Sequence, residues 1–209
     1  KLLAYIYRDD VEGKGTLSQD PLDRAFGLSA TVMNLNRDFV GYHETVVSVV
    51  LTIIAAHVHE QRRRLEEIPA EWEKLQAENK TNTFFVGEGK QKLKVVVVQH
   101  DHPGLVGFLR ARSTIHADIV VQALSSGHVN IVTRQDNRID LRGVIALLRR
   151  EEARRRNVEL SVPWEELVSP ERIKAVPNWY YDTAANTLQN GTAHSAGWEP
   201  TAIPLELIS

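Results

Sequence analysis

Four consecutive valines, Val95–Val98, constrain the fold more than any other feature of the sequence. They lie in a predicted strand, Leu93–Val98, and a continuous apolar run such as Val95–Val98 is typical of a central strand in a sheet. Similar but shorter patterns predict further strands, and the last two are joined by the turn-forming Ser125-Ser126-Gly127 into a hairpin. These further strands are expected at Thr83–Val86, Ala117–Ala123 and Val129–Thr133.

Helical periodicity dominates the first part of the chain. Between Glu44 and Leu65, apolar residues recur at helical spacing and three arginines follow in the last turns, where they favour the negative end of a helix. A second helix is expected over Glu71–Glu78, after a break at Pro69. The segment Ala25–Asn36 fits either a short helix or an extended edge.

The remaining segments complete an α+β fold, with a helical first part followed by a mixed α/β lobe that contains a small sheet. Pro103 suits the first turn of a helix that runs to about Arg112, and Asp140 suits the N-cap of another that ends near Asn157. Trp179–Asp182 and Asn186–Gln189 predict a terminal β element. The expected domains are residues 1–80 and 81–209.

Composition narrows the function classes. The chain of 209 residues is 43% hydrophobic and 25% charged, which is typical of a globular protein. It has no cysteine, so thiol catalysis and disulfides are excluded. Any metal must be bound by His, Asp or Glu side chains, and a cytoplasmic location is expected. The apolar run Val46–Val58 is shorter than the ~20 residues that span a bilayer, so no membrane segment is expected.

The sharpest candidate for chemistry is His100-Asp101-His102, which follows the central strand and precedes a helix. Open α/β sheets place ligands at this position, and two imidazoles with a carboxylate suit Mn²⁺ or Zn²⁺. In an extended segment, however, His100 and His102 point to one side and Asp101 to the other. The alternative is that Asp101 or His102 caps the next helix. Asp10, together with Asp9, is a second candidate for binding a cation. The alternative is that these two residues form an ordinary acidic surface loop.

Gly127, His128 and Arg134 are the candidate substrate-binding residues. Glycine lets the backbone approach a ligand, histidine can contact a phosphate, and the arginine fork suits a phosphate as well. The alternative for His128 is a solvent-exposed turn residue.

Arg134 opens a stretch, residues 134–156, with eight arginines against four acids. This stretch can hold a phosphorylated substrate or nucleic acid, but its Glu–Arg pairs at i,i+4 are also typical of a solvated helix face. The net charge of −2 gives no overall reason to expect nucleic acid. Trp179-Tyr180-Tyr181 can stack on a base or form the packed face of a sheet. P-loop, dinucleotide-fingerprint, nucleophile-elbow and zincin motifs are all absent from the sequence.

In its order of motifs the chain resembles the back half of a DHH-type, exopolyphosphatase-like, metal-dependent phosphoesterase. The similarity covers residues 5–155 and the pieces that carry it are Tyr7–Gly13, Leu28–Ala30, Leu35–Arg37, the long helix, Ala117–Val121, Gly127–Ile131 and Asp140-Leu141. The resemblance implies a front domain that binds manganese or magnesium through aspartates and an Asp-His-His motif, and a back domain that closes over the phosphorylated substrate.

The sequence departs from this family at its most informative motifs. It contains no Asp-His-His, and only Ser126-Gly127-His128 stands where the family has Gly-Gly-His. Because the chain begins at Lys1 without a methionine, we expect a catalytic front domain to precede it. The resulting hypothesis is that the chain is the substrate-binding portion of a metal-dependent phosphoesterase. Its expected substrate is a phosphorylated small molecule, a nucleotide or a polyphosphate, and a homo-oligomer is one expected form of the protein. The rival hypothesis is a non-catalytic binding or oligomerisation module, with its interface on helix 44–65 or on the 179–189 hairpin.

Overall fold

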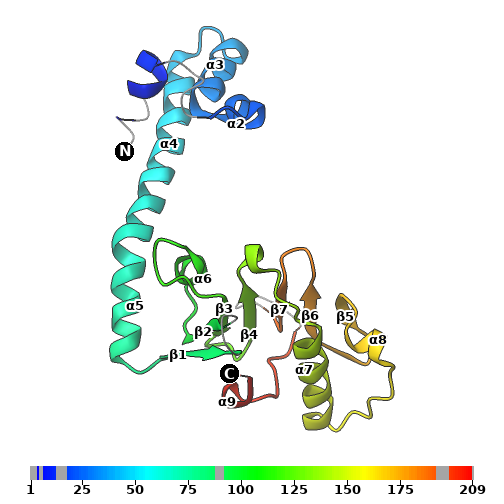
Figure 1. The fold of residues 1–209 in the computed structure, drawn as a ribbon. Helices are drawn as coiled ribbons and strands as arrows, with labels where there is room; N and C mark the ends of the chain where they lie inside the picture. Colours follow the sequence, from blue (N-terminus) through cyan, green and yellow to red (C-terminus); the bar gives the residue numbers. More distant parts are fainter. Residues whose placement is uncertain (1–3, 5–6, 13–17, 88–91, 192–197, 209) are drawn as a thin grey trace. The chain divides into compact units, whose positions relative to one another are not determined.

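The structure is a computed structural model, and it describes residues 4, 7–12, 18–87, 92–191 and 198–208 (Figure 1). The chain divides into two compact units, residues 1–63 and 64–209. This division lies earlier in the chain than the expected boundary at residue 80. The reason is that the helix before the sheet packs on the sheet itself, through Ile68, Trp72 and Leu75.

The first unit is helical. It contains a helical turn, η1 (Arg8–Glu12), and the helices α2 (Pro21–Phe26), α3 (Leu28–Asp38) and α4 (His43–Arg62). Asp20 caps α2 by accepting the backbone N–H of Leu22 at 2.8 Å, and Pro21 occupies the first turn. The segment that fitted either a helix or an extended edge is therefore helical, and the long helix lies where its periodicity predicts.

The sequence predicts a break in the helix at Pro69, but the structure has none there. One wide turn, η2 (Arg63–Glu67), leads directly into α5 (Ile68–Ala77), and Pro69 lies in the first turn of α5. Proline is tolerated there because the first N–H groups of a helix have no partner within it. The expected break is therefore wrong.

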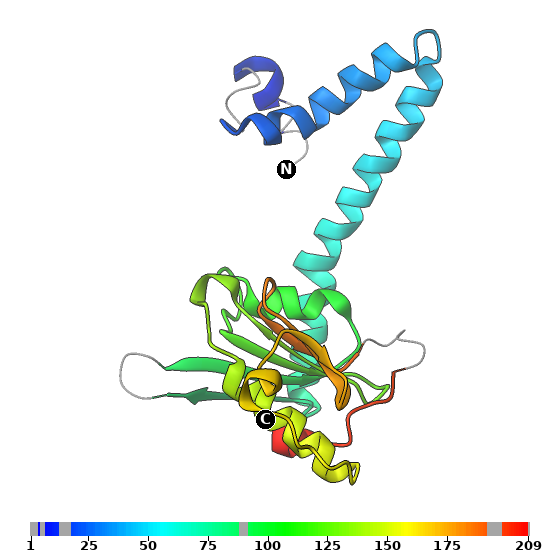
Figure 2. The same cartoon turned by 90° about the vertical axis from the view of Figure 1, so that its right-hand side faces the viewer.

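The second unit is built on one mixed sheet of seven described strands, in the order β1-β2-β3-β4-β7-β6-β5. Of the described strand pairs, only β2 and β3 are parallel, and α6 (Pro103–Arg110) makes the crossover between them. Figure 2 shows this sheet with the β3–β4 and β6–β7 hairpins side by side. The strands are β1 (Thr81–Val86), β2 (Leu93–Gln99), β3 (Ile119–Ala123), β4 (Val129–Thr133), β5 (Glu171–Ile173), β6 (Val176–Asp182) and β7 (Thr187–Gln189).

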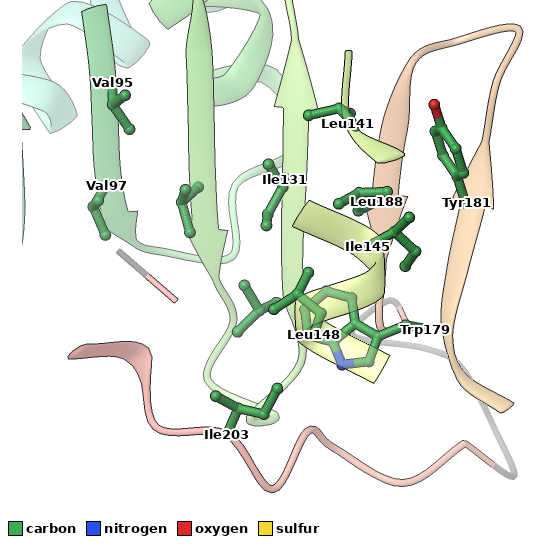
Figure 3. Packing of buried hydrophobic residues seen from close by; sticks show 12 residues of the cluster. Val95, Val97, Ile131, Leu141, Ile145, Leu148, Trp179, Tyr181, Leu188 and Ile203 are labelled. Atoms are coloured by element: carbon green, nitrogen blue, oxygen red, sulfur yellow. The ribbon is translucent and has the colours of Figure 1, made fainter. Parts of the chain in front are cut away.

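The four valines of β2 supply both faces of the sheet. Val96 and Val98 pack with α5 and α6 on one face. Val95 and Val97 belong to a cluster on the other face, which the helix α7 (Arg142–Arg155) covers (Figure 3). Because side chains alternate along a strand, a run of four valines is what a strand covered on both faces requires. The expected α+β class and central strand are both confirmed.

Trp179 and Tyr181 lie on the α7 face of the sheet and are buried (Figure 3). The expectation of a packed sheet face is confirmed for these two aromatics. The 179–189 hairpin is enclosed between β4 and β5, so its strands offer no free edge for an interface. A short helix, α8 (Trp164–Leu167), the strand β5 and a last turn, α9 (Leu205–Ile208), were not expected from the sequence. None of the described helices combines the length and apolar character needed to cross a membrane.

Candidate functional site

A pocket of about 580 Å³ lies at the carboxyl ends of β2 and β3, the two parallel strands. Ligands bind at this end of parallel strands in many α/β sheets, because the connecting loops diverge there. The pocket brings together residues that are distant in the sequence: His100 and Asp101 follow β2, Gly127 and His128 precede β4, and the C-terminal segment 201–206 forms one side. Four of the seven residues singled out in the sequence therefore line one pocket.

The turn between β3 and β4 forms one wall of the pocket. The N–H of Gly127 donates to Leu124 at 2.9 Å, and the N–H of Leu124 donates to His128 at 2.8 Å. This pair of bonds defines a hairpin turn that ends with a residue in the left-handed conformation, and Gly127 has a φ of +81°. A Cβ at Gly127 would lie 3.0 Å from Pro200, which is closer than ordinary van der Waals contact, so both the conformation and the space favour glycine here.

Asp101 ties the two loops of the pocket together. Its carboxylate accepts the backbone N–H of Ser125 at 2.7 Å and the Ser125 hydroxyl at 2.5 Å. These two hydrogen bonds lower the pKa of Asp101, so the carboxylate is charged at neutral pH. Asp101 thus fixes the distance between the ends of β2 and β3.

His128 is buried, with 5% of its surface exposed, so the expectation of a solvent-exposed turn histidine is wrong. Its Nδ1 lies 2.9 Å from the hydroxyl of Ser126, and its Nε2 lies 3.1 Å from the carbonyl oxygen of Trp198. A carbonyl only accepts, so Nε2 carries the proton and Nδ1 accepts from Ser126. Because both nitrogens are already bonded, the ring packs the pocket wall and offers no free nitrogen to a phosphate.

His100 and His102 use their Nδ1 atoms to order the loop before α6. Nδ1 of His100 accepts the backbone N–H of His102 at 3.1 Å, and Nδ1 of His102 accepts that of Gly104 at 3.0 Å. His102 is the N-cap of α6, so the capping alternative is confirmed. In each neutral ring the proton must then reside on Nε2, and that of His100 donates to Glu71 at 3.1 Å.

The manganese or magnesium that the resemblance implies does not fit these residues. Metal binding through Nε2 needs a lone pair on that atom, and would therefore cost each histidine its backbone hydrogen bond. Asp101 is already engaged by Ser125. Within the ranges that the structure describes, no three His, Asp or Glu side chains are grouped as metal ligands. Asp10 lies in η1, and its side chain is outside the described part of the chain.

Arg134 is not part of this pocket. It follows β4, whereas His128 precedes it, so the strand separates the two residues by about 20 Å. Arg134 forms ion pairs with Asp118 at 3.2 Å and Asp136 at 2.7 Å, and it also contacts His116. The sequence hypothesis that His128 and Arg134 share one phosphate is therefore not compatible with this geometry.

The arginine-rich helix α7 is only partly a solvated face. Arg149 is fully buried and donates to the carbonyls of Leu167, Ser169 and Glu171 at 2.8, 2.9 and 2.6 Å. Burial lowers its pKa to about 10, so it keeps its charge at neutral pH. Arg154 and Arg155 pair with Glu151, as the i,i+4 spacing of Glu151 and Arg155 predicts.

Glu152, also fully buried, fixes the segment that forms one side of the pocket. It accepts the Thr201 hydroxyl at 2.5 Å and the backbone N–H of Ala202 at 2.9 Å. Arg156 adds bonds to Glu152 and to the carbonyl of Pro200. The helix that suggested a phosphate site in the sequence instead holds the C-terminal segment against the sheet.

Lys80 and Glu206 line the pocket but were missed in the sequence. Lys80 directly precedes β1 and pairs with Glu78 at 2.8 Å. A lysine just before an edge strand carries no recognisable motif. Only the pairing of β1 with β2, which places Lys80 beside Gln99, brings it to the pocket.

Comparisons of the chain with models of protein families, with curated proteins and with solved structures found no match.

Proposed function

We propose that this chain binds a phosphorylated small molecule, such as a nucleotide or a polyphosphate, in the pocket at the carboxyl ends of β2 and β3. The observation that carries the proposal is that this pocket brings Lys80 together with the glycine turn at Gly127, at the carboxyl ends of the two parallel strands. In the context of the DHH-type resemblance, this is the substrate-binding part of a metal-dependent phosphoesterase. A cytoplasmic location belongs to the same proposal and rests on the cysteine-free composition.

Lys80 is the cation that we assign to the phosphate. Its partner Glu78 is exposed, and an exposed ion pair contributes little to stability, so a ligand phosphate can replace the carboxylate at low cost. The pocket also has apolar walls from Leu124, Ile203 and Leu205. A mostly apolar cavity with a few polar groups is typical of a small-molecule site.

The proposal assigns substrate binding to these residues and no bond-breaking step. His128 has no free ring nitrogen, and neither His100 nor His102 is available as a metal ligand without losing a backbone bond. Within this proposal, the contribution of the pocket residues is to orient the ligand between two loops that Asp101 holds together.

Calorimetric titration with adenosine monophosphate and with tripolyphosphate tests the proposal. We expect saturable binding of at least one probe to the full chain, and roughly tenfold weaker binding after Lys80→Met, because a charge-assisted bond is lost. Lys174→Met is the matched control, since this exposed lysine lies in the turn between β5 and β6. Absence of binding to both probes, or equal weakening by the two substitutions, would contradict the proposal.

A second candidate function, association with a protein partner, is favoured by the surface of the first unit. Among its described residues Val46 is the one buried hydrophobic side chain. Exposed apolar patches of this kind mark interaction surfaces. The most exposed apolar side chains of α2 to α4 and their connections include Leu22, Phe26, Phe39, Val40, Tyr42, Val47, Leu51 and Val58.

Light scattering combined with metal analysis tests this second candidate. If the α4 surface drives assembly, the chain forms a stable complex without metal, and Leu51→Asp on the exposed face of α4 weakens that complex. An assembly that Leu51→Asp leaves intact, or a monomer at every concentration, would exclude self-association through α4.

A further inference from the structure

Among the strands that the structure describes, none pairs with the outer side of the edge strand β1, which begins the strand order of the sheet. An open edge presents unpaired N–H and C=O groups, which bind another strand unless the edge is protected by charge, proline, a bulge or short length. The six residues of β1, Thr-Asn-Thr-Phe-Phe-Val, contain neither charge nor proline.

The opposite edge of the same sheet is protected in three of these ways. The strand β5 has only three residues, it carries Glu171 and Arg172, and its register shifts between Glu171 and Ile173. Glu171 also has a positive φ of 63°. One edge is therefore blocked, whereas β1 exposes 62% of Phe85 and 39% of Val86 beside its free backbone groups.

The register of β1 on β2 shows which backbone groups face outward. The N–H of Gln99 donates to the carbonyl of Lys80 at 3.0 Å, and the ladder then pairs Thr81 with Val98. Hydrogen-bonded and non-hydrogen-bonded pairs alternate along an antiparallel ladder. Asn82, Phe84 and Val86 therefore bond to β2, and Thr81, Thr83 and Phe85 direct their N–H and C=O groups to the open edge.

We propose that β1 pairs antiparallel with β1 of a second copy of this chain, in a register centred on Thr83. The three outward residues are spaced symmetrically about Thr83, as a two-fold axis requires: Thr83 faces Thr83 of the second copy, and Thr81 faces Phe85 of the second copy. Because the strand carries no charge, this pairing places no like charges opposite each other. The two sheets become one continuous sheet. This inference does not rest on ligand binding by the pocket.

Sedimentation of the full chain, with variants of β1, tests the pairing. Thr83→Pro removes an N–H that faces outward and leaves the bonds to β2 intact, so the protomer folds and the dimer dissociation constant rises on the order of tenfold or more. Thr83→Lys keeps the N–H but places two like charges opposite each other, and we expect it to weaken the dimer as well. Asn82→Lys is the control, since it adds the same charge opposite Phe84 of the second copy.

The expected result is a dimer of the wild-type chain that Thr83→Pro and Thr83→Lys weaken and Asn82→Lys retains. Circular dichroism verifies that each variant folds. If Thr83→Pro does not fold, Thr83→Lys still tests the pairing. A wild-type chain that stays monomeric overturns the proposal. So does a dimer that resists both Thr83 substitutions, which would instead point to the α4 surface.

Discussion

Gly127 holds a backbone conformation that costs any residue with a Cβ about 1–2 kcal/mol, and a Cβ here would also press on Pro200. We therefore predict that Gly127→Ala lowers the free energy of unfolding by at least about 1–2 kcal/mol. Gly107→Ala is the control, because Gly107 lies inside α6 with open space around it and alanine favours a helix by up to about 1 kcal/mol. Urea unfolding measures both. Equal effects of the two substitutions would refute the account of the turn.

Asp101 provides a prediction about pH. Ser125→Ala removes the hydroxyl bond that contributes most to the low pKa of Asp101, but it leaves the backbone bond. We expect the pKa of Asp101 to rise and to stay below its ordinary value. A carboxyl group whose pKa is lower in the folded than in the unfolded chain stabilises the fold when the pH is above the unfolded pKa, near 3.8. This stabilisation by Asp101 is lost as the pH falls through the folded pKa. A carboxyl-carbon NMR titration that shows no rise contradicts the prediction.

The sequence was informative about individual site residues when they stand beside strand ends. His100 and Asp101 were found because ligands bind at loops that follow apolar strands, and Gly127 and His128 because a glycine turn lets the backbone approach a ligand. The burial of His128 was not predictable, since the carbonyl that covers it belongs to Trp198, seventy positions later. Long-range contacts of this kind leave no local pattern.

At the scale of elements, α7 joins two parts of the fold through one buried cation. We predict that Arg149→Met lowers the free energy of unfolding by roughly 2–4 kcal/mol, because three backbone carbonyls lose their donor, the buried one of Leu167 among them. Arg150→Met, at the exposed neighbouring position, should change it by less than about 0.5 kcal/mol. Urea unfolding followed by tryptophan fluorescence measures the difference. Similar values for the two variants would show that Arg149 does not anchor α8 and β5.

Elements with strong periodicity were predicted well, and short or context-dependent ones were not. The β3–β4 hairpin and the helices α4 and α7 follow from local apolar patterns and turn residues. The strand β5 has three residues and depends on its pairing with β6, so its sequence alone carries no strand signal. Pro69 was misread because a proline in a first turn and a proline after a helix look alike in sequence.

At the scale of the molecule, the buried clusters all lie in the second unit. Their members run from Ile68 to Ile203, whereas Val46 is the one buried hydrophobic side chain among the described residues of the first unit. We predict that residues 64–209, expressed alone, fold with the same amide NMR spectrum as in the full chain. Residues 1–63 alone should lack a cooperative thermal transition, because the described residues of this segment bury too little apolar surface. The loss of structure in 64–209 on truncation would contradict this division.

The pocket is the central claim, and amide chemical-shift mapping of the full chain with adenosine monophosphate or tripolyphosphate tests it most directly. A ligand between the two loops should shift the amides of Lys80, His100, Ser125 and Gly127, which line the pocket. The amide of Arg134, at the other end of β4, should stay unchanged. Shifts centred on Arg134, or no saturable shift with either probe, would contradict the account.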